Sequence, residues 1–411
     1  MNDSAQRGVS RNTTLLIAAA AAVMLITTGI RQVSGLFVLP IISTTGLSIA
    51  SVSLALAIGQ FMWGATQPVF GALADHFGAF RVIAFGALLL AAGLVLTAFS
   101  HSQLTLIATM GVLSASGAAA GSFSILIGGT ARRLQAHQRS TAAGTINAGG
   151  SLGQFVFAPI AQFAIGARGW AVAMFALAAS ALATIPLAWQ LRDKAQPPTV
   201  AGSATVAGPT LREQLRIAAR DPSYILLNIG FFTCGFHVAF MVTHFPGEIQ
   251  NCGLLPNVAA NSLAIIGLFN VAGSIGAGML GQRFRMKHLL AAIYGARAVL
   301  IGIYLLMPKT SLNIYLFAAG MGMTWLATVP PTSGIVGKLY GVRYLGTLFG
   351  LTLVSHQTGA FLGAFLGGLA MAHLHSYQWV WFADMALALG AALINLPIRE
   401  DKPAPRAALA Q

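Results

Sequence analysis

Charged residues are scarce in this chain: only 8% of its 411 residues are Asp, Glu, Lys or Arg, whereas 56% are hydrophobic. A soluble globular chain typically carries about a quarter charged residues, so too few are present here to cover a water-soluble fold. Apolar stretches of about 20 residues, enough to cross a hydrocarbon layer of ~30 Å, recur along the whole sequence. The composition therefore excludes a soluble protein and predicts a polytopic membrane protein whose outer surface faces lipid.

Cysteines and catalytic motifs are scarce as well. Cys234 lies within an apolar stretch and Cys252 in a loop, which gives neither a disulfide framework nor a zinc spacing. The sequence has no HExxH motif, Walker loop or nucleophile elbow, and no pair of carboxylates in or near an apolar stretch. His373 and His375 lack acidic neighbours, so a solvated turn is a simpler interpretation than a metal site. We therefore predict no enzyme activity, no metal and no cofactor.

Twelve apolar segments predict an all-α membrane fold with twelve transmembrane helices. With both termini placed in the cytoplasm, nineteen of the 23 Lys and Arg residues fall in the tails or on the cytoplasmic side, and only Arg168 and Lys309 fall outside. The positive-inside rule predicts this asymmetry, so the net charge of +14 reflects topology and not a nucleic-acid partner. We predict a multi-pass protein of the cell inner membrane. The predicted spans lie near residues 14–41, 49–71, 82–99, 104–131, 140–164, 169–191, 223–247, 258–281, 287–307, 311–337, 343–372 and 377–398.

An internal repeat divides the chain into two halves. Residues 192–222 are the longest polar stretch and end in a basic amphipathic run. A shift of 206 residues aligns Gly29 with Gly235, Arg31 with His237, Pro40 with Pro246, Arg81 with Lys287, Gly144 with Gly350 and Gly153 with Gly359. We predict two pseudo-symmetric six-helix bundles, residues 1–191 and 223–411, joined by a cytoplasmic linker over 192–222. Chance matching between glycine-rich helices is the alternative.

The segment that leads from the second predicted helix into the third carries a motif. Its marked residues are Gly71, Asp75, Gly78 and Arg81. The segment resembles the signature loop of the major facilitator superfamily, and the resemblance implies that these four residues form a cytoplasmic gate that locks the two halves together. His76 and Ala79 stand where that family usually has basic residues, and Gly281 stands where the second half would need an aspartate. We therefore expect a lock on one side only, with an ordinary interfacial loop as the alternative.

Further segments resemble a bacterial branch of that superfamily, grouped with monocarboxylate porters and the oxalate:formate antiporter. The segments are 29–37, 234–244, 326–334 and 348–357, and the resemblance covers nearly the whole chain. It implies a monomeric secondary transporter that moves a small organic anion, a mono- or dicarboxylate, by alternating access. Proton symport and anion exchange both stay open. Export of drugs or other amphipathic compounds is the alternative, although exporters of cations commonly place carboxylates in the cavity, where this sequence offers Arg31 and only Glu248 at an outer tip.

Arg31 is the most informative single residue, because it stands at position 18 of a 28-residue predicted span. A charge at the bilayer centre costs roughly 2.5–3.5 kcal/mol on insertion scales, so a protein acceptor, water or an anionic substrate must stabilise it. In the superfamily fold, helices 1, 4, 7 and 10 line the central cavity, which implies that Arg31 and its repeat partner His237 lie on opposite walls. We predict that Arg31 binds substrate, with a purely structural arginine as the alternative.

Four weaker candidates complete the predicted site. Histidine is the side chain that ordinarily changes charge near neutral pH, so His237 could carry a proton as well as a hydrogen bond, although a bond to a neighbouring backbone is an equal alternative. Arg297 is predicted either to bind substrate or to pair with Asp384, which lies at a similar depth in the last helix. Asn147 and Thr328 are predicted lining residues, because they are polar positions in helices five and ten, but small residues in such helices also serve close packing.

Overall fold

A computed structural model describes residues 2–131, 133–134, 136–192, 210–341 and 344–400 of the chain. The described residues form helices and turns without any strand, which confirms the predicted all-α class. Residues 193–209 of the predicted linker lie outside the described residues. The remaining linker residues include α12 (Leu211–Arg220), a short helix that Thr210 caps by accepting a hydrogen bond from the backbone N–H of Glu213.

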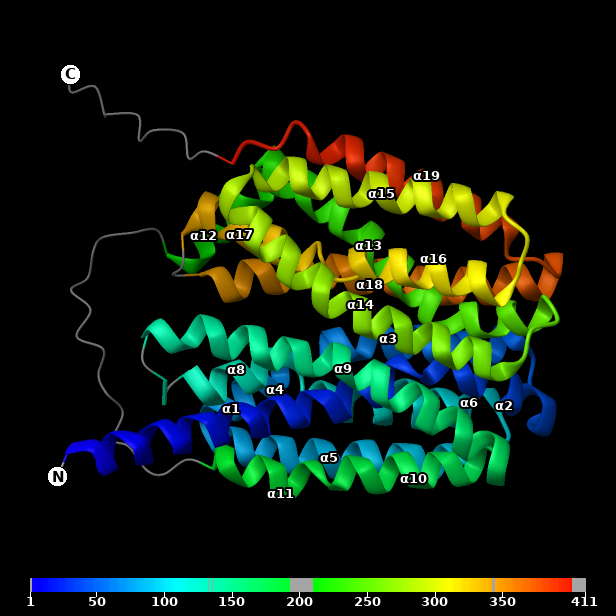
Figure 1. The fold of residues 1–411 in the computed structure, drawn as a ribbon, viewed down its shortest axis with the longest axis horizontal. Helices are drawn as coiled ribbons and strands as arrows, with labels where there is room; N and C mark the ends of the chain where they lie inside the picture. The colour runs from blue at the N-terminus through cyan, green and yellow to red at the C-terminus, as the bar shows by residue number, and fades with distance from the viewer. Residues whose placement is uncertain (1, 132, 135, 193–209, 342–343, 401–411) are drawn as a thin grey trace.

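The first half of the chain runs from α1 to η3 (Figure 1). The first, second, fourth and sixth predicted spans are each divided into two or more elements. The first span continues past α1 into a 3-10 turn and a short helix that ends at Gly46, whose φ of 70° favours glycine. The fourth span contains the π-helical segment η2. The elements are α1 (Asn2–Gln32), η1 (Ser34–Phe37), α2 (Val38–Thr45), α3 (Ile49–Ala65), α4 (Gln67–Phe77), α5 (Ala79–Thr97), α6 (Gln103–Leu106), η2 (Ile107–Ser114), α7 (Ala115–Ala119), α8 (Phe123–Ala131), α9 (Ala136–Arg168), α10 (Trp170–Leu182), α11 (Thr184–Ala188) and η3 (Trp189–Leu191).

The second half runs from α13 to α19, and its tenth predicted span is broken. Pro330 and Pro331 stand in the first turn of the helix after the break, where the missing N–H groups cost nothing. The elements are α13 (Pro222–Asn251), α14 (Pro256–Arg283), α15 (Met286–Leu306), α16 (Ser311–Thr324), α17 (Val329–Tyr340), α18 (Leu345–Leu374) and α19 (Gln378–Asn395).

The twelve predicted spans agree with these helices. Ten segments of the described chain are long and apolar enough to cross a membrane, and α18 and α19 correspond to the last two predicted spans. The second segment extends to Phe77, further than predicted, so that Gly71 and Asp75 belong to the helix itself. Figure 1 shows the helices of the first half gathered in one bundle and those of the second half in another, with the start of α1 and the last described residues after α19 on the same side of the molecule, here called the side of the termini.

The two bundles use equivalent glycines at equivalent helix crossings. In the first bundle a Cβ atom added to Gly29 of α1 would lie 2.8 Å from the carbonyl oxygen of Gly153 on α9. In the second bundle a Cβ atom on Gly235 of α13 would overlap the carbonyl oxygen of His356 on α18, and one on Gly359 would overlap that of Phe232. Close backbone approach of this kind requires small residues. The predicted repeat positions thus pack alike in both halves.

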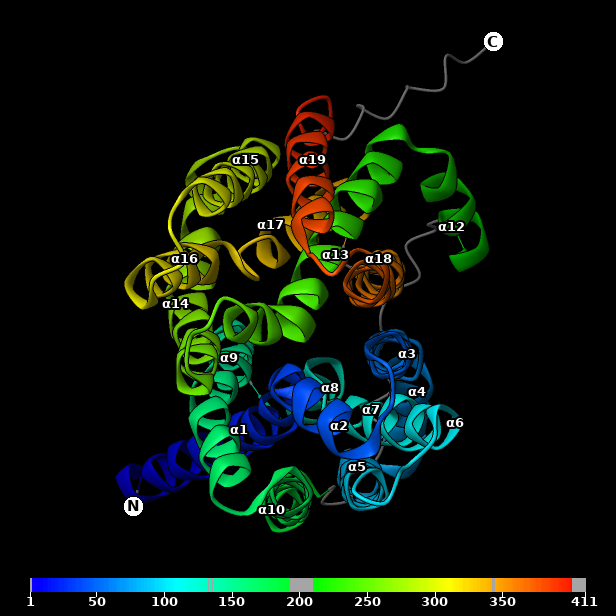
Figure 2. The ribbon, with the colours of Figure 1, turned by 90° about the vertical axis from the view of Figure 1, so that its right-hand side faces the viewer.

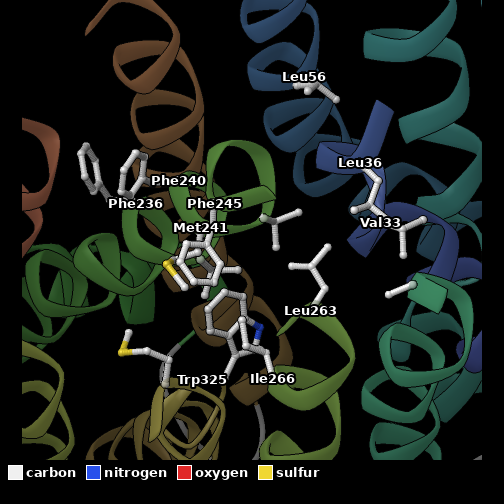
Figure 3. Packing of buried hydrophobic residues seen from close by; sticks show 14 of the residues in the cluster. Val33, Leu36, Leu56, Phe236, Phe240, Met241, Phe245, Leu263, Ile266 and Trp325 are labelled. Atoms are coloured by element: carbon white, nitrogen blue, oxygen red, sulfur yellow. The ribbon is translucent and has the colours of Figure 1, made fainter. Parts of the chain in front are cut away.

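The halves meet from their middle to the end opposite the chain termini. Gly35 lies against the backbone of Val242, and Gly368 lies against the side chain of Ser53. Asn270 of α14 donates to the hydroxyl of Ser151 on α9 at 2.9 Å. Figure 2 views the molecule from this end, with α2 and α13 near each other. Figure 3 shows Val33 and Leu36 of the first half and Met241, Phe245 and Leu263 of the second, which belong to one continuous hydrophobic core.

Candidate functional site

Arg31 stands in the last turn of α1, beside two side chains of α3. Its Nη1 donates to Oε1 of Gln60 at 2.5 Å, and its guanidinium carbon lies 4.2 Å from the ring centroid of Trp63. Its Nε is buried and has no hydrogen-bond partner among the described residues, and none of their carboxylates forms an ion pair with it. A neutral amide and an aromatic face stabilise this cation without neutralising it.

The Arg31 side chain lines a pocket in the first bundle with a cavity volume of about 60 Å³. The other polar side chains of the lining are Gln60, Ser34 and Ser114. Such a pocket can hold a small molecule with one anionic group and an apolar body. The remaining lining residues are Ile30, Phe37, Leu56, Gly59, Leu90, Leu94, Met110, Ala115, Ala118, Met174 and Leu177.

His237 lies in the second bundle and is paired with Asp384. Its Nδ1 lies 2.5 Å from Oδ2 of Asp384 on α19, and the two residues are 1% and 0% exposed. The Trp325 ring packs edge-on against the imidazole at a centroid distance of 5.8 Å. Nε2 of His237 and Oδ1 of Asp384 have no hydrogen-bond partner in the described part of the chain. From the sequence, Asp384 was predicted only as a possible partner for Arg297, and its pair with His237 was not predicted.

Arg297 of α15 is fully buried and faces the break between α16 and α17. Its Nη2 donates to the carbonyl oxygens of Thr324 and, at 2.6 Å, of Trp325. These carbonyls belong to the C-terminal end of α16, where orphan acceptors and the helix dipole favour a cation. No ion pair joins Arg297 to Asp384 among the described residues, and Arg297 is not part of the Arg31 pocket lining.

The two predicted lining residues lie apart from the Arg31 pocket. Thr328 is fully buried beside Cys234, with 3.2 Å between Oγ1 and Sγ. Asn147 is half-buried on α9 and does not belong to the pocket lining. The structure therefore brings Thr328 and Arg297 to the same helix break, places His237 with Asp384, and leaves Asn147 separate. Gln60 and Trp63 were missed, although a glutamine within an apolar span is itself a signal of a polar contact.

The predicted gate lies where the chain passes from α4 to α5. Gly78 has a φ of 88°, which favours glycine and reverses the chain between the two helices. Asp75 and Arg81 are exposed there, whereas a Cβ atom on Gly71 would meet nothing within 4 Å. The second half has its own charged contact near the equivalent loop: Glu400, which the sequence did not single out. It accepts from the backbone N–H of Lys287 at 2.6 Å and from Nζ of Lys338 at 2.7 Å.

Two bundles of helices long enough to cross a membrane, with a pocket lined by a charged side chain between the helices of one bundle, are typical of a membrane transporter. The sequence model of the Major Facilitator Superfamily matches residues 15–364, and the chain belongs to this superfamily.

Among its relatives, monocarboxylate transporter 13 of Rattus norvegicus is 25% identical over 376 residues, which cover 90% of this chain and 85% of that protein. The oxalate:formate antiporter of Oxalobacter formigenes is 23% identical over 389 residues, covering 90% of this chain and 87% of that protein. Among solved structures, a D-xylose-proton symporter superposes with a TM-score of 0.71 at 14% identity, covering 95% of this chain and 99% of that one, and supports the fold.

Proposed function

We propose that this protein transports a small organic anion, a mono- or dicarboxylate, by alternating access, and that Arg31 binds the carboxylate. The observation that carries the proposal is the unneutralised Arg31 guanidinium in a largely apolar pocket. The names of the two curated relatives, a monocarboxylate transporter and an oxalate:formate antiporter, support an anionic cargo. Proton symport and anion exchange are the two candidate coupling modes.

The shape and charge of the pocket favour a monocarboxylate. Arg31 is the one charged side chain in its lining, and the remaining walls are mainly aliphatic and aromatic. Arg297, which could have supplied a second cation for a dicarboxylate, is engaged by backbone carbonyls in the other bundle. A carboxylate with an apolar body would exchange water for both a charge-assisted hydrogen bond and apolar contacts.

Alternating access would require the contacts between the halves to separate. The glycine contacts at Gly35 and Gly368 would open when the pocket faces the end opposite the termini. In this proposal Asp75, Gly78 and Arg81 close the other end of the molecule. That end faces the cytoplasm if both termini lie on the cytoplasmic side of the cell inner membrane. The monomer contains both bundles and is the proposed working unit.

Carboxylate binding to purified protein tests the proposal. A thermal-shift screen would use benzoate, isobutyrate, pyruvate, oxalate and succinate, because a ligand that binds the folded state raises its apparent stability. Arg31→Gln removes a charge-assisted contact that contributes about 1.5–3 kcal/mol, so it should lower carboxylate affinity on the order of 10- to 100-fold. Arg31→Lys should restore part of it, since an ammonium lacks the bidentate fork.

Arg283→Gln provides the matched control, because Arg283 is exposed at the end of α14. It should bind as the unmodified protein does. Equal affinity of the unmodified protein and folded Arg31→Gln would remove Arg31 from the site and would favour the drug-export alternative.

A further inference from the structure

Titratable side chains form one stripe along α13. His237, His244 and Glu248 are separated by seven and four residues, spacings that place all three on the same face of a helix. All three are largely buried, and the stripe follows α13 toward the end of the molecule opposite the termini. Helix α19 packs along α13 and supplies Asp384, together with Trp381 in its first turns. A buried row of this kind within a membrane span marks a candidate proton pathway.

Each member of the stripe has a defined polar contact. Glu248 accepts from the hydroxyl of Tyr304 at 2.9 Å and from the indole N–H of Trp381 at 2.7 Å. His244 places Nε2 2.7 Å from the carbonyl oxygen of Ala364, to which it donates, and Nδ1 3.4 Å from the Tyr377 hydroxyl. The stripe ends at the His237–Asp384 pair. Its members are therefore held in fixed positions between the outer end and the interior of the bundle.

The His237–Asp384 pair is poorly satisfied for a purely structural contact. Buried polar atoms normally have partners, yet Nε2 of His237 and Oδ1 of Asp384 have none among the described residues. Both groups can accept a proton at these atoms. Other titratable or charged side chains of this bundle are Arg297 and Tyr294 on α15, Cys234 on α13 and His356 on α18. Arg297 and Cys234 both contact the backbone carbonyl of Trp325, whose ring packs against His237.

Charge balance connects this pair to transport. With neutral His237, the negative charge of Asp384 offsets the positive charge of Arg297 within the second bundle. One additional proton adds a positive charge to the interior of this bundle, and burying an unbalanced charge is costly. A carboxylate bound at Arg31 would bring a negative charge to the first bundle. Proton and anion together leave the net charge of the interior unchanged, which favours their movement as a pair.

We propose that the His237–Asp384 pair is the binding site of a proton that is transported together with the carboxylate. The proton reaches it from the end opposite the termini along Glu248 and His244. This inference rests on the proposed function, because it takes a carboxylate as the cargo, and it selects symport over exchange as the coupling mode.

Transport in proteoliposomes separates the two claims. Isotope-labelled benzoate, isobutyrate and pyruvate would be followed in two modes: self-exchange at equal pH, which needs the cargo site, and accumulation driven by a proton gradient, which needs proton coupling. Asp384→Asn and His237→Gln should retain self-exchange and lose accumulation. His101→Gln, in an exposed loop, is the matched control and should accumulate like the unmodified protein.

The outcomes distinguish the failures. Absence of self-exchange of every probe by the unmodified protein would overturn the proposed function itself. Self-exchange without gradient-driven accumulation by the unmodified protein would overturn the proton site alone, as would full accumulation by Asp384→Asn. If neither pair variant folds, self-exchange is lost as well, and Glu248→Gln becomes the deciding variant. Accumulation slowed relative to self-exchange then supports the stripe, and an unchanged ratio overturns it.

Discussion

Replacement of Arg297 tests whether this arginine stabilises the broken helix or binds substrate. Arg297→Gln removes the cation that the carbonyls of Thr324 and Trp325 accept from. A hydrogen bond from a charged donor contributes about 1.5–3 kcal/mol, and removal of one member of a buried charge arrangement costs about 3–5 kcal/mol. We therefore expect Arg297→Gln to lower the free energy of unfolding by about 3–5 kcal/mol. The free energy of unfolding of Arg297→Lys should lie between that of the unmodified protein and that of Arg297→Gln, because an ammonium keeps the charge but cannot reproduce the planar fork.

Unfolding in mixed detergent micelles, followed by tryptophan fluorescence, measures these differences. Arg283→Gln is again the control and should lie within about 0.5 kcal/mol of the unmodified protein, since the side chain is exposed. Carboxylate affinity of folded Arg297→Gln should remain close to that of the unmodified protein. An unchanged free energy of unfolding, together with a loss of affinity as large as that of Arg31→Gln, would refute this interpretation and would make Arg297 a substrate group.

Two further predictions address packing and topology. Gly235→Ala should destabilise the second bundle by more than about 1 kcal/mol, because its Cβ would overlap the backbone of His356, whereas Gly350→Ala has open space and should cost little; equal effects in the same unfolding assay would contradict the crossing. Single cysteines at Ser102 and Ala207, in a background without the native cysteines, should react with an impermeant reagent from the outside and the inside of the cell respectively, as expected for cytoplasmic termini. Labelling of both from one side would contradict the topology.

The number and type of helices could be predicted because apolar length and charge asymmetry are local properties of the sequence. The repeat was visible as well, and its glycines Gly29 and Gly235 occupy equivalent crossings in the structure. The break in the tenth helix lies directly before Pro330 and Pro331, which stand in the first turn of α17. These features depend on residues close together in the chain or on a constant offset.

Side-chain pairing across bundles of helices could not be predicted in the same way. Depth in the membrane suggested Arg297 as a partner for Asp384, but helix rotation decides contacts, and it turns Asp384 to His237. The common register, together with the resemblance to the superfamily, likewise implied that Arg31 and His237 lie on opposite walls of one central cavity. In the structure Arg31 faces the pocket of its own bundle, and His237 is buried in the other.

The difference between the two bundles follows from what stands at the repeat-equivalent positions. At the offset of 206 residues, Asp384, Arg297 and Trp325 of the second bundle correspond to Ala178, Ala91 and Ala119 of the first. These alanines are all buried, so the first bundle has small apolar groups where the second has a carboxylate, a guanidinium and an indole.

Because of this asymmetry, the repeat-equivalent side chains of Arg31 and His237 have different neighbours. His237 meets a carboxylate supplied by the protein, in a bundle whose interior also contains the fully buried Arg297 and Trp325. Arg31 has no such carboxylate among the described residues, and its bundle retains the pocket. A buried cation still requires an anionic or strongly polar partner. In the proposed function, a substrate carboxylate would pair with Arg31 in the first bundle as Asp384 pairs with His237 in the second.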